Sequence, residues 1–124
     1  MTVLYTADHE WLKIDGDIAT VGVTDYAQSQ LGDVVFVELP KVGAKVTAKK
    51  SFGVVESVKA VSDLFAPLTG EIVEVNGALP NEPQAVNQDP YGKGWMIVVA
   101  PAKPDEWKEL MTAAQYEQFL TEGH

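Results

Sequence analysis

The segment 53–75 constrains the fold of this chain more than any other. Two stretches rich in β-branched and aromatic residues, 52–58 and 61–65, are separated only by Lys59 and Ala60. This pattern predicts a β-hairpin with a lysine at its tip. Two-residue hairpin turns favour Asn-Gly or Asp-Gly because both central residues need positive φ, and Lys-Ala offers neither. A position that breaks a local rule in this way is a candidate functional site.

A lysine on a stiff turn is a good acceptor for an acyl group, because a modifying enzyme can reach its amine without unfolding the chain. The alternative is an ordinary solubilising lysine on a loop, as most lysines are. The residues around Lys59 favour the acceptor and resemble the lipoyl-attachment hairpin of the biotinyl/lipoyl carrier family. This resemblance depends on Glu56, Ser57, Val58, Ala60, Gly43 and Gly70. It implies that these residues set the geometry of the hairpin and its recognition by the modifying enzyme.

Three further blocks extend the resemblance over nearly the whole chain and narrow it to the H proteins of the glycine cleavage system. These blocks are Asp8-His9-Glu10-Trp11, the segment 21–28 continuing into 31–40, and the segment 87–95. The chain departs from the family pattern at two places that bear on partner docking. Gln30 stands where some relatives have histidine, and Val98-Val99 replaces a more basic strand end.

The resemblance implies a lipoic acid cofactor, joined by an amide to Lys59 and ending in a dithiolane. In the H-protein cycle, this arm takes an aminomethyl group from PLP-dependent glycine decarboxylase and delivers it to a folate-dependent aminomethyltransferase. Dihydrolipoamide dehydrogenase then reoxidises the arm. A lipoate ligase or lipoyltransferase would attach the cofactor. The chain would therefore carry a cofactor for a multienzyme system and would not be an enzyme itself.

The loaded end of such an arm is a cationic amine that needs protection from water. We expect a cleft beside the hairpin to shelter it, because a cation removed from water needs an opposite charge or an acceptor. Glu10 and Asp63 are the candidate carboxylates, and Gln30 is assigned to the same cleft.

Other carriers and other classes of protein remain as alternatives. A biotin carrier would present Met-Lys-Met, whereas Val58 and Ala60 flank this lysine. A lipoyl domain of a 2-oxoacid dehydrogenase usually has aspartate directly before the lysine. An H-like protein that donates its lipoyl group to other lipoate-dependent enzymes is the main alternative, since its attachment hairpin would look the same. A scaffold protein, in contrast, would never be acylated.

Length, charge and composition limit the remaining possibilities. The 124 residues predict a single lipoyl-carrier domain, 1–124, with the lipoyl-type core at about 32–100 and C-terminal helices at about 104–122. The net charge of −9 repels phosphate backbones and anionic lipids, so nucleic acid and membranes are not expected partners. With no signal-peptide pattern, we expect a cytoplasmic protein, and we expect a monomer.

The chain lacks the residues that metal and thiol sites need. It contains no cysteine, so any thiol chemistry must come from a cofactor. His9-Glu10 begins like a zinc-protease motif, but no second histidine follows at the required spacing, so we expect no metal site. With two histidines in the whole chain, one of them at the C-terminus, we expect no catalytic residues either.

A weak internal repeat in the sequence predicts the architecture. The segments 32–37 and 70–75 share the order glycine, acid, apolar, valine, any, valine, and the lysine turn lies between them. This weak repeat suggests two similar half-sheets related by an approximate two-fold axis. We therefore expect a mainly β fold, a barrel-sandwich hybrid or flattened β-barrel, with short peripheral and C-terminal helices.

Local patterns predict the other elements. Strands are expected at 11–14 and 18–23 with an Asp15-Gly16 turn, at 33–39, and at 95–99. Thr24 should cap a short helix that Gly32 ends, and further helices should begin at Pro104 and Thr112.

Overall fold

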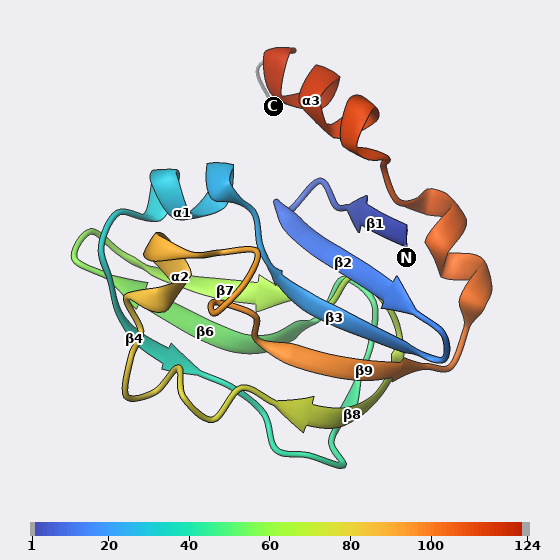
Figure 1. Ribbon diagram of the computed structural model, residues 1–124, viewed down its shortest axis with the longest axis horizontal. Helices are drawn as coiled ribbons and strands as arrows, with labels where there is room; N and C mark the ends of the chain where they lie inside the picture. Colours follow the sequence, from blue (N-terminus) through green and yellow to red (C-terminus); the bar gives the residue numbers. More distant parts are fainter. Residues whose placement is uncertain (1, 123–124) are drawn as a thin grey trace.

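Two β-sheets make up most of the computed structural model, which describes residues 2–122 (Figure 1). The larger sheet has six strands in the order β1-β2-β3-β9-β8-β5, and the smaller has three in the order β4-β6-β7. The strands are β1 (Thr2–Tyr5), β2 (Glu10–Asp15), β3 (Ile18–Val23), β4 (Val34–Glu38), β5 (Lys45–Val46), β6 (Ser51–Ser57), β7 (Val61–Phe65), β8 (Gly70–Val75) and β9 (Ile97–Pro101). The predicted mainly β fold is confirmed.

Within residues 2–122, four short helices lie at the periphery of the sheets. They are α1 (Asp25–Leu31), α2 (Ala85–Gln88), the 3-10 helix η1 (Pro104–Glu109) and α3 (Ala113–Thr121). Figure 1 shows α3 projecting beyond β1 and α1, away from the smaller sheet. No helix within residues 2–122 is long and apolar enough to cross a membrane.

The two strands with similar sequences lie in different sheets, as the repeat predicted, since β4 belongs to the smaller sheet and β8 to the larger. The sheets nevertheless differ in size, and the expected similarity of two half-sheets does not extend to their strand number. The reason is that β1, β2 and β3 all add to the sheet of β8, through the antiparallel pairing of β3 with β9.

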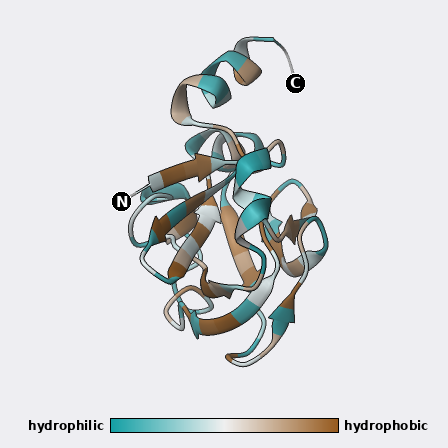
Figure 2. Ribbon diagram, turned by 90° about the vertical axis from the view of Figure 1, so that its right-hand side faces the viewer, coloured by the Kyte–Doolittle hydropathy of each residue, from teal (hydrophilic) through white to brown (hydrophobic). Residues whose placement is uncertain are grey.

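The core lies between the two sheets and takes apolar side chains from both. Val37 and Val55 face inward from the smaller sheet, and Leu12, Val21 and Ile72 from the larger, all of them almost fully buried. Each such side chain contributes roughly 1.5–3 kcal/mol by its burial. Figure 2 shows the corresponding hydrophobic stretches along the strands. The core thereby gives the hairpin of β6 and β7 a rigid base.

The first hairpin turn and the start of the last strand lie at other residues than predicted. Asp15 pairs with Ile18, so the tight turn consists of Gly16 and Asp17, one residue later than predicted. Gly16 takes a φ of 63°, which glycine allows at little cost. The last strand begins at Ile97 and not at Trp95, because the carbonyl of Trp95 accepts a hydrogen bond of 2.7 Å from the side-chain amide of Asn76.

The predicted helix caps are confirmed. The Thr24 hydroxyl accepts a hydrogen bond from the Ala27 N–H at the start of α1, and Gly32 ends that helix with a φ of 79°. At the start of α3, Thr112 and Gln115 form a reciprocal capping box. Both helices begin with a side chain that satisfies free backbone N–H groups, which stabilises their first turns.

Replacing Gly70 with alanine should destabilise the fold. An added Cβ would overlap the carbonyl oxygen of Ala100 and lie 2.7 Å from a Val99 methyl group, so β8 and β9 would have to separate. We expect a loss of about 1–3 kcal/mol in the free energy of unfolding, measured by urea denaturation. Gly77→Ala is the matched control, since a Cβ there meets nothing within 4 Å. Equal stability of the two variants would contradict this packing argument.

Candidate functional site

Lys59 lies in a turn formed by residues 57–60 at the end of the β6–β7 hairpin. The Ser57 N–H donates to the Ala60 carbonyl at 2.8 Å, and the Ser57 hydroxyl accepts from the N–H groups of Lys59 and Ala60, both at 3.2 Å. No residue of this turn has positive φ. The prediction of a Lys-Ala turn is wrong by one residue, because the serine side chain stabilises a turn centred on Val58 and Lys59.

The tip of the hairpin is held against the segment that follows α1. The Val58 N–H donates to the Asp33 carbonyl at 3.0 Å. The side chain of Asn87 holds the same segment, because its amide donates to the Gly32 carbonyl at 2.8 Å and its oxygen accepts from the Val34 N–H at 2.8 Å. These bonds tie three distant parts of the chain together and fix the root of the Lys59 side chain.

Gly32 ends α1 and also leaves space for the Lys59 side chain. The Lys59 side chain runs across it, and a Cβ built on Gly32 would lie 3.2 Å from Lys59 Cε. Its φ of 79° is also a conformation that side chains disfavour. A glycine at this position therefore lets the lysine stem lie along the end of α1.

A pocket of about 290 Å³ lies directly beside Lys59. Its size is close to the lower limit of about 300 Å³ for small-molecule sites. The walls come from the hairpin, from α1 and from the segment that leads into β2, which lie next to one another in Figure 1. The lining residues are Asp8, His9, Glu10, Val23, Tyr26, Ala27, Gln30, Leu31, Val55, Ser57, Lys59, Ala60, Ser62, Asp63 and Leu64.

Glu10 is the buried acid of this pocket, with 3% of its surface exposed. One carboxyl oxygen accepts the Phe65 N–H at 2.8 Å, and the other accepts the Thr6 hydroxyl at 3.4 Å. Burial raises the pKa of Glu10 to about 8, against the opposite effect of the hydrogen bond from Phe65. Glu10 is therefore mostly a neutral acid at neutral pH, ready to ionise when a cation comes near.

The pocket brings together six of the residues that the sequence suggested. Lys59, Ser57 and Ala60 come from the turn, Asp63 from β7, Glu10 from β2 and Gln30 from α1, and all six line the pocket.

The other four suggested residues lie outside the pocket. Val58 is 68% exposed at the tip, and Glu56 pairs with Val61 in the ladder of the hairpin. Gly43 has a φ of 92°, and its N–H donates to the carbonyl of Ile72 in β8. Gly70 lies at the start of the same strand. The two glycines shape the larger sheet and do not contact the lysine turn.

His9 lies in the loop before β2 and also lines the pocket beside Lys59. It has a φ of 65°, which is unusual outside glycine, and its ring Nδ1 forms a hydrogen bond of 2.8 Å with the hydroxyl of Tyr116 on α3. Burial lowers the pKa of His9. Only its place beside Glu10 in the Asp-His-Glu-Trp block could have indicated this role. Within residues 2–122, no group of three histidine or carboxylate side chains could hold a metal ion.

Comparisons with known proteins match nearly the whole chain, and they all identify the same family. The family model described as "Glycine cleavage H-protein" matches residues 3–123. The glycine cleavage system H protein of Geobacillus kaustophilus (strain HTA426) is 57% identical over 119 residues, which are 96% of this chain and 94% of that protein. The H protein of Bacillus subtilis (strain 168) is 54% identical over 118 residues, 95% of this chain and 93% of its own length.

A solved structure extends this similarity to three dimensions. The crystal structure of a glycine cleavage system H protein from Mycobacterium marinum matches with a TM-score of 0.88 and 47% sequence identity, covering 96% of both chains. These matches show that the chain belongs to the glycine cleavage H-protein family, whose members carry a lipoyl group between enzymes and are not catalysts themselves.

Proposed function

We propose that Lys59 is the residue that carries the lipoyl group, through an amide on its side-chain nitrogen. The observation that supports this best is the combination of a lysine at an exposed, hydrogen-bonded turn with a pocket alongside it. Lys49 and Lys93 also lie in exposed turns beside pockets. Lys59 differs from them because, within residues 2–122, it is the one lysine that lines the pocket with the buried acid Glu10.

The residues around Lys59 fit such a group. An amide-linked arm needs a root that does not move, and the bonds of Ser57, of Val58 to Asp33 and of Asn87 supply one. A tethered group reaches high effective concentration at a partner's active site only if its root is reliably presented. When bound, the lipoyl group would supply a dithiolane, a disulfide that is reduced as it accepts an aminomethyl group.

The pocket residues would protect a cationic amine from water. Glu10 sits at the buried end, and because its pKa is about 8 it can release its proton when a cation enters. Asp8 and Asp63 are exposed carboxylates among the lining residues, and Gln30 offers a neutral hydrogen-bonding group from α1. Apolar side chains of Val23, Leu31 and Leu64 would exclude water around them. The pocket therefore pairs charge compensation with exclusion of water.

Membership of the family implies interaction with the other glycine cleavage enzymes. We propose glycine decarboxylase, aminomethyltransferase and dihydrolipoamide dehydrogenase as the partners at Lys59, with a lipoate ligase or lipoyltransferase attaching the arm. We place this work in the bacterial cytoplasm, in line with the bacterial relatives, and expect the carrier to act as a monomer.

Lipoylation in vitro tests the assignment directly. The unmodified protein is incubated with lipoate, ATP and a lipoate ligase, and its intact mass is then measured. We expect the mass to rise by one lipoyl group, and peptide mapping should place that group on Lys59. Modification of another lysine, or no modification, would contradict the assignment.

The same material separates the shuttle from the alternative of an H-like lipoyl donor. The lipoylated protein is assayed for glycine decarboxylation with its cognate partners, and also for transfer of its lipoyl group to a 2-oxoacid dehydrogenase domain. We expect the lipoylated protein to support glycine decarboxylation. If it transfers its lipoyl group but does not support glycine decarboxylation, the chain is an H-like lipoyl donor.

A further inference from the structure

All four tyrosines of the chain line a single pocket between α3 and α1. Tyr5 comes from β1, Tyr26 from α1, Tyr91 from the loop after α2 and Tyr116 from α3. The pocket has a volume of about 410 Å³. In Figure 1, α3 lies above β1 and to the right of α1. We refer to this pocket as the tyrosine pocket; its other lining residues are Asp25, Ser29, Ala113, Glu117 and Leu120.

The aromatic walls of the tyrosine pocket are held in place by hydrogen bonds and stacking. The rings of Tyr5 and Tyr116 stack at 4.8 Å with an angle of 8° between their planes. The Tyr116 hydroxyl forms bonds of 2.8 Å with His9 and with Thr24, which is fully buried. The Tyr91 hydroxyl accepts the Asp25 N–H at 3.0 Å. The walls are therefore arranged before any ligand binds, which lowers the entropic cost of binding.

The electrostatic character of the tyrosine pocket favours a positive charge. Two carboxylates, Asp25 and Glu117, line it, and none of its described lining residues is a lysine. Burial raises the pKa of Tyr5, and the neighbouring Tyr91 and Glu117 raise it further. Burial likewise raises the pKa of Tyr116. Burial disfavours a charge of either sign, so the attraction for a cation comes from the carboxylates of Asp25 and Glu117 and from the π electrons of the ring faces.

We propose that the tyrosine pocket binds the guanidinium group of an arginine side chain from a partner enzyme. A guanidinium is planar, stacks on aromatic rings, and can form paired hydrogen bonds with a carboxylate such as Asp25 or Glu117. The chain cannot supply this group itself, because all nine of its basic residues are lysines. A guanidinium must therefore come from outside, and the net charge of −9 would steer a basic partner toward the chain.

The position of the pocket explains why the arginine should belong to an enzyme that acts at Lys59. Tyr26 lines both the tyrosine pocket and the pocket beside Lys59, so α1 forms a shared wall. A partner seated on one pocket is thus next to the other. Naming the partner in this way rests on the proposed function, whereas binding of a guanidinium to the tyrosine pocket does not.

A binding experiment tests the proposal on the unmodified protein. N-acetyl-L-arginine methylamide is titrated into ¹⁵N-labelled protein, with the citrulline analogue as the neutral probe of the same shape. We expect the arginine probe to shift the amide signals of 25–29 and 113–120, and the citrulline probe to bind at least about fivefold more weakly. Equal responses to the two probes, or shifts confined to other segments, would overturn the proposal.

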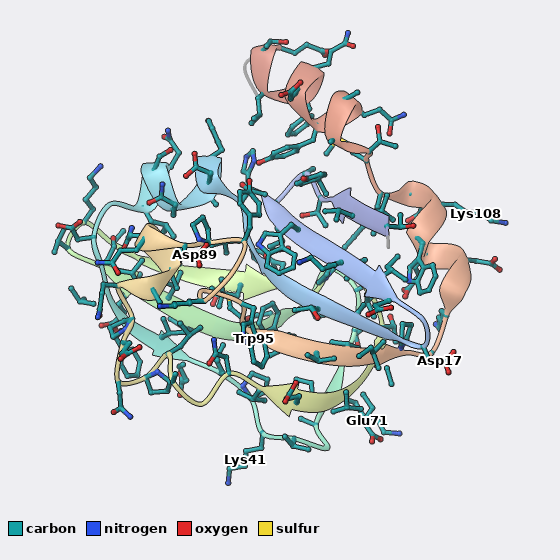
Figure 3. The ribbon with its side chains drawn as sticks, in the orientation of Figure 1. Asp17, Lys41, Glu71, Asp89, Trp95 and Lys108 are labelled. Carbon is teal, nitrogen blue, oxygen red and sulfur yellow. The ribbon has the colours of Figure 1, made fainter. Side chains whose placement is uncertain are left out.

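Matched variants locate the binding. Glu117→Gln should weaken the arginine probe about two- to fivefold, as expected for one exposed charge contact. Tyr91→Leu should weaken it by a similar factor, whereas Tyr91→Phe, which keeps the ring, should change it less than about twofold. Glu71→Gln removes the same charge as Glu117→Gln from β8, which Figure 3 shows far from α3, and should have no effect. Tighter binding of tetramethylammonium than of the arginine probe would overturn the assignment of a guanidinium.

The docking part of the proposal has its own measurement. Lipoylated Glu117→Gln and Tyr91→Leu proteins are assayed as substrates of glycine decarboxylase. We expect KM for the carrier to rise about two- to fivefold with little change in kcat, while Glu71→Gln behaves as the unsubstituted protein. Unchanged KM values would refute the docking role. Failure of Lys59 to accept lipoate would instead count against the proposed function and leave the probe binding unaffected.

Discussion

Lys59→Arg should give a folded protein that accepts no lipoyl group. Arginine keeps the positive charge and most of the stem, but its guanidinium stays protonated and cannot attack an activated acyl group as an amine does. Because the chain has no cysteine, every thiol found after reduction must belong to the cofactor. We therefore expect both thiols of the lipoyl group in the reduced, lipoylated protein and none in Lys59→Arg, together with complete loss of glycine decarboxylation.

The matched control for this experiment is Lys50→Arg. Lys50 is another exposed lysine near a strand end, but it does not line the pocket beside Lys59. It should be lipoylated at Lys59 and show the normal thiol content. Thiols in reduced Lys59→Arg, or their loss in Lys50→Arg, would mean that the arm is attached elsewhere. Far-ultraviolet circular dichroism of both variants checks that neither result comes from unfolding.

Glu10→Gln should remove most of the decrease in stability that the protein shows as pH rises. The pKa of Glu10 is about 8 in the folded protein against 4.5 for a free side chain, so between these values the folded state binds more protons than the unfolded state. Its contribution to stability is fully present below about pH 4.5 and is lost as pH rises to about 8. The loss amounts to about 1.4 kcal/mol per pH unit, and about 3–5 kcal/mol over the window.

Glutamine keeps the shape of Glu10 and the acceptor for the Phe65 N–H, but it has no proton to lose. The measurement is the free energy of unfolding in urea at several pH values across the same window. Near the acidic end, Glu10→Gln and the unsubstituted protein should be similar, and near the basic end the variant should be the more stable. Glu71→Gln controls for the loss of one negative charge. Parallel pH profiles for Glu10→Gln and the unsubstituted protein would show that Glu10 is not held neutral by the fold.

The strands and caps could be predicted because their patterns are local. Alternation of apolar residues marks β2 and β3, and Thr24 and Thr112 each stand three residues before the N–H group that they cap. The hairpin turn was predicted one residue late. The Ser57 hydroxyl stabilises the observed turn, whereas the prediction considered only which residues allow positive φ. Strand number in each sheet was also missed, since nothing local indicates which sheet β1–β3 will join.

The candidate site was predictable only in part, for the same physical reason. A resemblance of motifs identified Lys59 and suggested Glu10 and Asp63, which the fold does bring to one pocket. The part played by His9 depends on a hydrogen bond to Tyr116, which is 107 positions away in the chain, and no local pattern encodes such a contact. The tyrosine pocket could not be predicted either, because its four rings come from four separate parts of the chain.

The bonds that Val58 and Asn87 make to the segment 32–34 mean that the direction of the lysine is not a property of its own hairpin. An excised peptide spanning 51–65, or the same hairpin transplanted into another scaffold, would carry every residue around the modified nitrogen and yet lack the brace that aims it. Engineers who wish to move this attachment point between proteins must therefore transfer the segment after α1 and its asparagine clamp as well.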